Sequence, residues 1–360
     1  MLKNLYVKFF PMPKYLMAPS FGLDISDESL KFVELVPDKN GIKLGRYGER
    51  KIPPGVIESG QIKDSKKLQE VMMSLRKEEG IKFVRISLPE EQIYLFGLKL
   101  DKDGLENVRE SIEFSLEEHI PIPAQDAIFD YEFLNQDEKK LNLQVAVIPK
   151  NVIENYLSVF KDSLISVQSC ELEAQAIARA VIKKGDLETY MIVDFGKTRT
   201  GIFIVSHGLV ASSSTLKISG EMLNDTIAKK LNITLEEAEK IKKEYGLQRN
   251  QENNEISSAV LESISVLRDE VVKRIIYWNT HKDEEGKDNP MIQKIILSGG
   301  DANLIGLPEY FSLSTKNKVE IGNIWVNVMD TTKNVPEVNF NRSLTFAAAL
   351  GLALGDFEYD

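Results

Sequence analysis

The sequence is poor in the residues that metal and redox sites use. One cysteine and three histidines occur among its 360 residues, and His119, His207 and His281 lack the short spacings typical of metal ligands. A single cysteine excludes an internal disulfide and fits a reducing compartment. Cys170 stands in a stretch that reads as helical, with no histidine near it in the sequence, so we predict a buried core residue rather than a nucleophile.

An excess of positive charge and a long apolar run are also missing. The chain has 45 basic and 55 acidic residues, and its net charge of −10 argues against a broad nucleic-acid-binding surface. No apolar run approaches the ~18 residues that a membrane helix needs. Residues 1–20 combine lysines with aromatics but lack the apolar core of a signal peptide. We expect them to pack on the first domain, with a weak amphipathic membrane contact as the alternative.

What the sequence does contain fits a globular protein of more than one domain. Hydrophobic residues make up 42% of the chain and charged residues 28%, which is the balance of an ordinary soluble protein. The length of 360 residues is enough for two domains.

Residues 190–205, YMIVDFGKTRTGIFIV, contain the Gly-Lys-Thr letters that end a phosphate-binding P-loop. The first glycine of that motif is missing, because Met191 stands five residues before Gly196. The residues after Thr200 form a β-branched run and not a helix, so the P-loop is excluded. The segment instead predicts two strands joined by a short polar turn, with Asp194 near the end of the first strand.

A similar unit occurs near the start of the chain. Residues 21–35, FGLDISDESLKFVEL, predict a strand, a polar turn that follows Asp24, and a second strand. A lone aspartate at a strand end is common in turns. Its repetition in a matching unit predicts two similar halves, each of which places one carboxylate at a shared cleft. A third polar turn, Ser298-Gly299-Gly300, follows a predicted strand; its glycines would let the backbone approach a ligand closely, and it does not match the Rossmann fingerprint.

Helices and strands alternate between these turns and after them. Residues 90–149 predict a compact insert with the order strand, helix, strand, strand, in which the helix covers 104–119. The other predicted helices show apolar residues at helical spacing, and one of them begins with a capping box at Thr234. They cover residues 67–80, 151–163, 171–184, 221–232, 234–246, 258–281 and 344–354.

In this order, the pieces resemble the actin–Hsp70–hexokinase superfamily of ATPases over nearly the whole chain. The insert is similar to the subdomain that the cell-division protein FtsA and the pilus protein PilM share. EEHIPIPAQDAIFDYEFL (117–134) is very similar to the PilM pattern, and ISGEMLNDTIAKKL (218–231) and EEAEKIKKEYG (236–246) also look like PilM or FtsA. The chain therefore resembles the PilM family of type IV pilus assembly proteins. The resemblance implies an α/β actin-like ATPase fold with two similar halves around a nucleotide cleft.

The resemblance also implies how the chain is divided. Subdomain 1A would comprise residues 1–89, 164–190 and 340–360, and the insert, an SHS2-type subdomain 1C, would comprise residues 90–163. Subdomain 2A would comprise residues 191–219 and 291–339, and subdomain 2B residues 220–290.

In such a fold the phosphates of ATP would lie between the first two turns. The resemblance implies that Asp24 and Asp194 hold Mg²⁺ through its waters, because Mg²⁺ dehydrates reluctantly. Backbone N–H groups would cradle the β- and γ-phosphates. Lys31 would reach a phosphate as a point charge, unless its side chain only extends along the strand surface. The residues assigned to the phosphates are Ser26, Asp27, Lys31, Gly196, Lys197, Thr198, Arg199 and Thr200.

The nucleoside would lie against three glycines, Gly220, Gly299 and Gly300. Glu239 and Lys242 match family positions near the nucleoside, although their strongly charged helix would also fit a solvated face. These five residues complete the nucleotide-binding set that the resemblance implies.

One acidic residue is assigned to the chemistry. Glu173 would position the hydrolytic water, with Gln175 as the alternative and an ordinary surface helix position as the competing interpretation.

The chain also departs from the family pattern. Ser26 stands where the first turn usually has glycine, Lys197-Thr198 replace a Gly-Gly pair, and Asp301 replaces a small residue. These departures are compatible with ATP binding, but they argue against fast hydrolysis, which needs a precisely placed water.

The biological role implied by the resemblance is that of a scaffold. PilM-like proteins are cytoplasmic, lie at the inner membrane through a partner, and bind the N-terminal cytoplasmic peptide of the bitopic protein PilN. The helix at 104–119 and its strands would form the floor for that peptide. Pilus motor or other assembly proteins are further expected partners, and the sequence leaves homo-oligomerisation open. An FtsA-like cell-division protein and a small-molecule kinase of the same superfamily are the alternatives.

Overall fold

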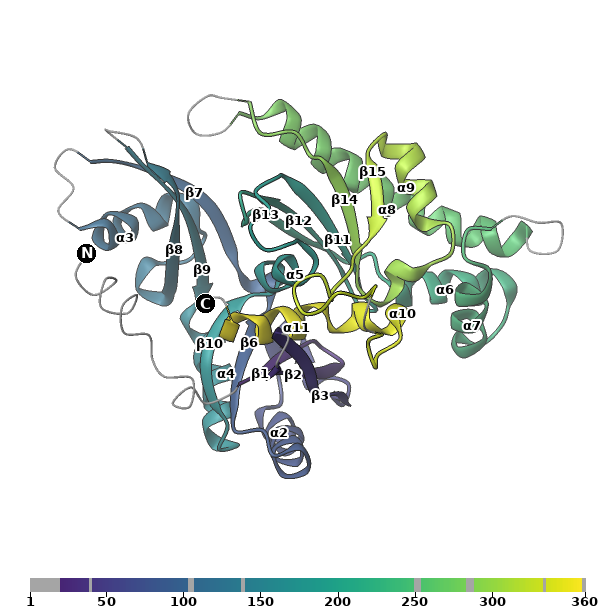
Figure 1. Cartoon of the computed structure of the whole chain (residues 1–360), viewed down its shortest axis with the longest axis horizontal. Coiled ribbons are helices and arrows are strands. Elements are labelled where there is room, and N and C mark those ends of the chain that lie inside the picture. Colours follow the sequence, from purple (N-terminus) through teal and green to yellow (C-terminus); the bar gives the residue numbers. More distant parts are fainter. Residues whose placement is uncertain are drawn as a thin grey trace.

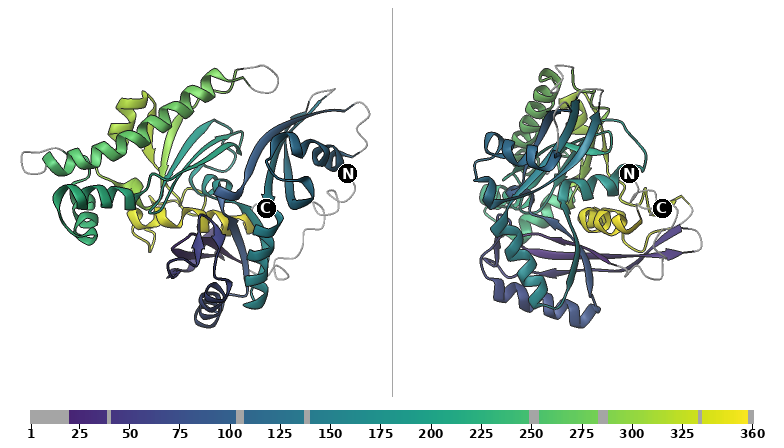
Figure 2. Two further views of the ribbon diagram at one scale, coloured as in Figure 1. Left: turned by 180° about the vertical axis from the view of Figure 1, so that it is seen from behind. Right: turned by 90° about the vertical axis from the view of Figure 1, so that its left-hand side faces the viewer.

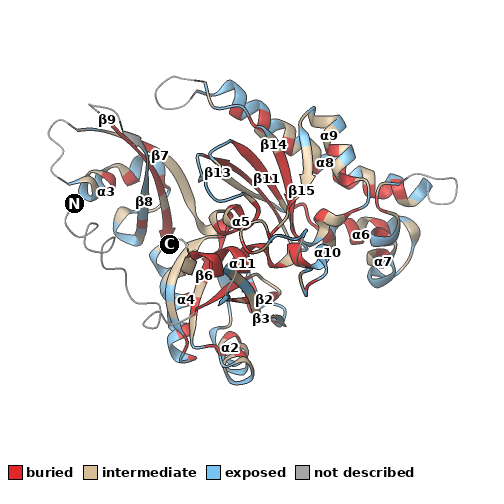
Figure 3. Ribbon diagram, viewed as in Figure 1, coloured by how far each residue is buried: buried red, intermediate tan, exposed pale blue. Residues whose placement is uncertain are grey.

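The computed structural model has two halves, each centred on a five-stranded sheet (Figure 1). The central strands of both sheets are largely buried, as the red ribbons in Figure 3 show, whereas the edge strands are mostly half-buried or exposed. The structure describes residues 20–38, 41–102, 107–136, 140–248, 254–282, 288–332 and 335–357. The predicted role of residues 1–20 as a packed extension therefore falls almost wholly outside the described residues.

The first sheet has the strand order β10-β6-β1-β2-β3. Its first three strands in the sequence form an antiparallel meander, while β6 runs parallel to β1 and β10 runs parallel to β6. The strands are β1 (Phe21–Ile25), β2 (Ser29–Asp38), β3 (Gly41–Lys51), β6 (Phe83–Leu88) and β10 (Ser166–Leu172), and a small hairpin pairs β4 (Ile57–Glu58) with β5 (Gln61–Ile62).

The second sheet repeats this topology. Its order is β13-β12-β11-β14-β15, again with an antiparallel meander of three strands followed by two strands parallel to the first. The strands are β11 (Tyr190–Phe195), β12 (Thr200–Ser206), β13 (Leu209–Leu216), β14 (Lys294–Ser298) and β15 (Lys318–Ile321). The prediction of two similar halves is confirmed.

Two helices built from small residues lie between the sheets. Helix α11 (Ala347–Leu354) contacts β1, β2 and β6 of the first half, and α5 (Glu173–Val181) packs on α11 and contacts β12 and β13 of the second half. The backbones approach so closely that a Cβ on Gly22 would lie 1.8 Å from the Ala349 carbonyl oxygen, and one on Gly351 would lie 1.7 Å from that of Ala176. The alanines and glycines of these segments therefore allow the two halves to pack through a thin helical layer (Figure 2).

The insert is a separate small sheet with its own core. The strands β7 (Tyr94–Asp101), β9 (Lys140–Pro149) and β8 (Ala127–Gln136) pair in that order, and α3 (Val108–His119) covers one face. It stands at the left of Figure 1, beside the second sheet. Helix α4 (Lys150–Asp162), which follows β9, packs with α2 (Ser65–Glu79) in the core of the first half.

The second half carries the remaining long helices. They are α6 (Gly220–Leu231), α7 (Leu235–Tyr245), α8 (Asn254–Thr280) and α9 (Leu307–Thr315). Helix α7 begins with the predicted capping box, in which the Thr234 hydroxyl and the Glu237 carboxylate each cap the other residue's backbone N–H. Short turns complete the fold: α10 (Phe340–Ser343), η2 (Glu90–Gln92), η3 (Ala124–Asp126), η4 (Gly300–Asn303), η5 (Leu344–Phe346) and η6 (Gly355–Phe357). Within the described residues, no helix combines the length and apolarity needed to cross a membrane.

Several sequence-based assignments were wrong in detail. Cys170 lies on β10 and not in a helix, because the helix predicted for 171–184 begins only at Glu173 and ends at Val181. The third strand of each meander and the last strand, β15, were not predicted. β3 alternates exposed and half-buried residues at the edge of its sheet, so it lacks the apolar run by which its neighbours are recognised.

Candidate functional site

An aspartate and a serine lie side by side in each half. Asp24 stands near the end of β1, and the Ser87 hydroxyl at the end of β6 donates to its carboxylate over 3.0 Å. In the second half, Asp194 on β11 is paired in register with Ser298 on β14. Since β6 and β14 run parallel to β1 and β11, the carboxyl ends of these central strands place both acids at one edge of each sheet, where ligands of α/β sheets bind.

The two halves bring these acids close enough to interact. Burial raises the pKa of Asp194 to about 6; the Ser298 hydroxyl opposes this rise, and the charge of Asp24 adds to it. Asp24 itself is buried. Repulsion between carboxylates that are poorly hydrated is the electrostatic condition under which a divalent cation is attracted.

A third acid, Glu173, lies in the same group at the first position of α5. Burial raises its pKa to about 8, the Arg199 charge lowers it, and the carboxylates of Asp24 and Asp194 raise it. The sequence-based alternative of an exposed surface position is therefore excluded, because Glu173 is only 9% exposed.

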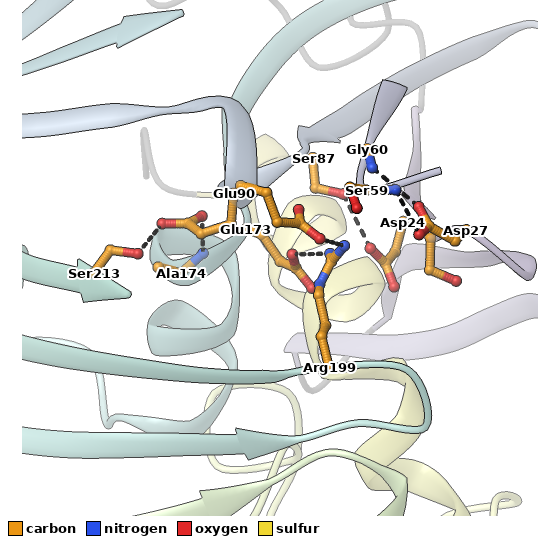
Figure 4. A network of polar contacts seen from close by, with 12 residues as sticks. Asp24, Asp27, Ser59, Gly60, Ser87, Glu90, Glu173, Ala174, Arg199 and Ser213 are labelled. Carbon is orange, nitrogen blue, oxygen red and sulfur yellow. Dashed lines mark hydrogen bonds and ion pairs between the residues drawn. The ribbon is translucent and has the colours of Figure 1, made fainter. Parts of the chain in front are cut away.

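Arg199 crosses from the β11–β12 turn to the first half. Its guanidinium donates to Glu173 over 2.6 Å, as Figure 4 shows. It also donates to Glu91 over 2.6 Å. The neighbouring Glu90 accepts hydrogen bonds from the Ser213 hydroxyl of β13 and from the Ala174 backbone N–H of α5, and its burial raises its pKa. Arg199 was expected to contribute its backbone N–H, and the structure in addition gives its side chain a part in joining the two halves.

The two turns have the same backbone hydrogen bond, which corrects part of the predicted phosphate cradle. The Ser26 N–H donates to the carbonyl of Ser29, and the Gly196 N–H donates to that of Arg199, at 2.9 and 3.0 Å. These N–H groups are therefore used within the turns. Among the described residues, the N–H groups of Asp27, Lys197, Thr198 and Arg199 make no protein hydrogen bond, so they are donors that the two turns can offer to an anion.

The side chains of the first turn have separate roles. The Asp27 carboxylate accepts from the backbone N–H groups of Ser59 and Gly60, at 2.8 and 3.0 Å, and so fixes the turn on the first half (Figure 4). Lys31 stands opposite Asp24 in the β1–β2 register, with its amino group 4.0 Å from that carboxylate. Its side chain thus points toward the acids and does not only extend along the strand.

The Lys197 side chain joins the two turns. Its amino group lies 2.5 Å from the carboxylate of Glu28 in the first turn and 3.2 Å from that of Glu221 on α6. Thr200, in contrast, is fully buried, and its hydroxyl donates to the carbonyl of Ile218 over 2.6 Å. Thr200 was assigned to the phosphate-binding set, whereas in the structure its hydroxyl supports the loop before α6.

The predicted nucleoside residues fall into two groups. Lys242 is buried, pairs with Asp301 at 2.5 Å and donates to the Gly220 carbonyl over 3.1 Å, so it holds α7, α6 and the third turn together. A Cβ on Gly220 would lie 1.9 Å from the Asp301 carboxylate, which explains why this position is occupied by glycine. Glu239 pairs instead with Lys243 on the surface of α7, and this partner lowers its pKa.

The third turn requires its first glycine. Gly299 has a φ of +88°, and a Cβ there would lie 2.5 Å from the carbonyl oxygen of Phe195. Gly300 is less restricted, since its Cβ would meet only the Thr345 side chain at 3.1 Å. The backbone of the third turn is therefore held directly against the end of β11, next to Asp194.

The side chains at this site suit a cation that keeps its waters better than one that is coordinated by protein ligands alone. Among the described residues, no group of three or more histidine, cysteine or carboxylate side chains is arranged to hold a metal. Two aspartates on opposite sides suit Mg²⁺, which keeps several waters and takes its remaining ligands from phosphates. The hydroxyl oxygen of Ser298 is buried beside Asp194 without a well-formed hydrogen bond. It can therefore still form a hydrogen bond with a water of the bound Mg²⁺.

Sequence reasoning missed Ser87, Glu90 and Glu91. They follow one another closely at the end of the buried strand β6, on either side of Pro89. Acidic residues directly after a buried parallel strand are a signal for this edge of the sheet, and could have been used.

The structure also contains a cavity beside the insert. A cavity of about 680 Å³ separates the insert from β6, β10 and α5. On β9, the side chains of Leu143 and Val145 belong to the core under α3, while Gln144 and Ala146 line the cavity. The amide nitrogen of Gln144 is buried and has no hydrogen-bond partner. Cys170 also lines this cavity, and burial, followed by the charge of Glu171, raises the pKa of its thiol to about 11.

Two sheets of the same topology, joined by a thin helical layer, with one buried aspartate from each close enough to interact, define an actin-like ATPase fold. Among solved structures, the chain is similar to EutJ, an ethanolamine utilization protein from Carboxydothermus hydrogenoformans, with 18% identity, a TM-score of 0.55, and coverage of 98% of this chain and 94% of that one. The chain belongs to the PilM family of type IV pilus assembly proteins, whose family model matches residues 22–357.

Two further solved structures agree with this fold. A PilM–PilN type IV pilus biogenesis complex matches with a TM-score of 0.78 at 21% identity, over 95% of this chain and 99% of that one. MreB5 of Spiroplasma citri bound to ADP matches with a TM-score of 0.57 at 15% identity, over 95% and 96% of the two chains. The predicted family and the predicted fold class are thus confirmed.

Proposed function

We propose that this protein binds ATP with Mg²⁺ between its two halves and uses the bound form as a scaffold for pilus assembly. The observation that carries this proposal is the repeated pair of an aspartate and a serine, one pair in each half, at the carboxyl ends of the central strands. Asp24 and Asp194 would hold the waters of Mg²⁺, and the free N–H groups of Asp27, Lys197 and Thr198 would receive the phosphates. The bound ion would neutralise the acids and shield the charge of the phosphates.

Hydrolysis in this site should be slow. Glu173 would be the group that orients water, but its carboxylate is already paired with the Arg199 guanidinium at 2.6 Å. While this ion pair persists, Glu173 is not free to orient an attacking water, so Arg199 must first move away. We therefore assign the nucleotide a conformational role, which agrees with the slow hydrolysis expected from the sequence.

The nucleotide proposal is tested by titrating a fluorescent ATP analogue with and without Mg²⁺. Asp24→Asn and Asp194→Asn should each weaken Mg²⁺-dependent binding by at least about tenfold, which is the loss expected for a charged hydrogen-bond partner. Asp225→Asn, an exposed position on α6, is the control and should bind as the wild type does. Equal affinity in all four proteins would remove the site assignment.

We further propose that the cavity beside the insert receives the N-terminal cytoplasmic peptide of a PilN-like membrane protein. The solved relative was determined as a complex of PilM with PilN. The cavity supports this assignment because it is lined by apolar residues of β8, β9 and α4, and because the buried amide of Gln144 lacks an acceptor. A peptide carbonyl would supply one, and an unpaired buried donor costs about 1–3 kcal/mol.

This partner would place the protein in the cytoplasm at the inner membrane, without a membrane span of its own. The helix-covered insert would be the subdomain that recognises the partner, and the subdomain boundaries predicted from the sequence remain part of the proposal.

The peptide proposal has its own test. A synthetic peptide with the N-terminal residues of the PilN-like partner should bind wild-type protein, and Ala146→Trp, which fills the cavity, should abolish binding. Gln144→Ala should weaken binding by about fivefold or more, whereas Gln61→Ala, which removes a surface amide on β5, should not. Full binding by the Ala146→Trp protein would exclude the cavity as the peptide site.

A further inference from the structure

The wall of the cavity comes from both halves of the molecule. Most of its lining belongs to the insert and the first half, but Leu209 and Val210 at the start of β13 belong to the second half. β13 also contacts β7 of the insert. The shape of the cavity therefore depends on how the second sheet is placed relative to the insert.

One side chain fixes this placement. Gln175, in the first turn of α5, donates from its amide nitrogen to the Gly208 carbonyl over 3.0 Å and accepts from the Val210 N–H over 3.2 Å. A primary amide that both donates to and accepts from the backbone of one turn holds that turn in a single register. Both polar atoms of the Gln175 amide are therefore used to bind the β12–β13 turn. The alternative predicted from the sequence, in which Gln175 positions a hydrolytic water, is wrong.

The same turn of α5 also holds the candidate nucleotide site. Two residues before Gln175, the Glu173 carboxylate pairs with Arg199 in the β11–β12 turn. The two turns that α5 contacts stand at opposite ends of β12, which is fully buried between β13 and β11 in the second sheet. A buried strand that is paired on both sides moves as a rigid element, so a displacement of one turn is transmitted to the other.

We propose that β12 couples the nucleotide cleft to the cavity and that Gln175 is the positioning residue that transmits the coupling. The inference rests on the proposed function, since it explains how ATP would change the partner site. Phosphates in the cleft would compete with Glu173 and Glu91 for the Arg199 guanidinium, because a phosphate is an equally good partner for its fork of N–H groups. A shift of the Arg199 turn then moves β12, and Gln175 ties that movement to the position of Leu209 and Val210 over the cavity. By linkage, a ligand in the cavity must change the affinity for ATP by the same factor.

The single cysteine of the chain is a built-in probe for this coupling. Cys170 lines the cavity and is half-buried, and the sequence contains no other thiol, so the rate of its reaction with N-ethylmaleimide reports on access to the cavity. The raised pKa of the thiol slows the reaction but does so equally in every variant at a fixed pH. A Cys170→Ser protein supplies the background rate.

The experiment compares this rate in the full chain with and without Mg²⁺-ATP for three proteins. Wild type should show a change of about fivefold or more, the lower range of allosteric couplings. Gln175→Met has similar volume but cannot pair with the turn, so its rates with and without nucleotide should converge. Gln92→Met removes a comparable amide-to-carbonyl hydrogen bond within the first half and should retain the wild-type response.

The outcomes separate this inference from the proposal on which it rests. If the fluorescent analogue binds wild type but the labelling rate does not respond, the coupling is refuted and nucleotide binding stands. If Gln175→Met responds as strongly as wild type, Gln175 is not the positioning residue. If no nucleotide binds to wild type, the proposed function itself has failed.

Discussion

The guanidinium of Arg199 lies 2.6 Å from the carboxylate of Glu173, and this ion pair links the second turn to the first half of the molecule. Both side chains are largely buried, and the guanidinium also pairs with Glu91 at 2.6 Å. The pair thus connects the two walls of the candidate cleft at the point where phosphates would enter.

Replacing Arg199 should destabilise the protein strongly. Arg199→Ala would leave two poorly hydrated carboxylates without a cation, and we expect the free energy of unfolding to fall by about 3 kcal/mol. Chemical denaturation at pH 7.5 measures this change. Arg50→Ala is a matched control, because Arg50 also pairs with two glutamates, Glu78 and Glu79, but more openly to solvent. It should cost less than about 1 kcal/mol; equal losses would show that the Arg199 network is not special.

The acids of the cleft should make stability depend on pH in a defined direction. The pKa of Asp194 is raised from 3.8 to about 6 in the folded protein, so the folded state holds this proton more tightly than the unfolded state. The contribution of Asp194 to stability therefore becomes less favourable as the pH rises from about 4 to about 6 and stays unfavourable above it.

The Asp194→Asn protein removes this effect. Without nucleotide, it should be more stable than wild type at pH 8 by up to about 3 kcal/mol, and the difference should disappear near pH 4. Urea denaturation of both proteins across this range checks the prediction. A difference that does not vary with pH would mean that the Asp194 carboxylate is not desolvated.

Gly299 is expected to be required in the third turn. Gly299→Ala combines a left-handed backbone with a Cβ only 2.5 Å from the Phe195 carbonyl oxygen, so we expect a loss of more than about 2 kcal/mol and weaker ATP binding. Gly185→Ala has a similar φ of +83° but no atom within 4 Å of the new Cβ. It should cost only about 1 kcal/mol. Thermal melts of the two variants therefore distinguish the steric clash of the new Cβ from the strain of the left-handed backbone.

Much of this architecture was predictable because the local signals agree with the fold. The strand–Asp–turn–strand units at Asp24 and Asp194, the glycines of the third turn and the capping box at Thr234 each have a sequence signature with a physical cause. The family resemblance then supplied their order in space. The edge strands β3, β13 and β15 were not predicted from the sequence, because their alternating or half-buried side chains give no clear run of apolar residues.

The long-range partners in the site could not be predicted from the sequence. Arg199 was assigned through its backbone, because nothing near it in the sequence shows that Glu91 and Glu173 would meet it. The same holds for Lys242, whose charged helix suggested a solvated face, although its amino group is buried against Asp301. Such pairs are set by the approach of the two halves and of separate elements, which no single segment encodes.

The buried pair of Lys242 and Asp301 should behave as a coupled unit. Lys242→Met alone would leave the Asp301 carboxylate uncompensated beside Gly220 and should cost about 3 kcal/mol. Adding Asp301→Asn removes that charge, so the double variant should recover a large part of the loss. A double-mutant cycle from denaturation curves measures the coupling. Additive losses would show that the two side chains act independently.

The ion pair between Lys197 and Glu28 should oppose nucleotide binding. Their charged groups lie 2.5 Å apart and join the two turns between which the phosphates are expected, so bound phosphates must compete with Glu28 for the Lys197 amino group. Glu28→Gln should tighten the binding of the ATP analogue by about three- to tenfold, because it removes both the competitor and a repelling charge. The gain should shrink at high salt. Glu78→Gln, a surface carboxylate on α2 remote from the turns, is the control and should leave affinity unchanged; weaker binding by Glu28→Gln would mean that the pair assists binding and does not oppose it.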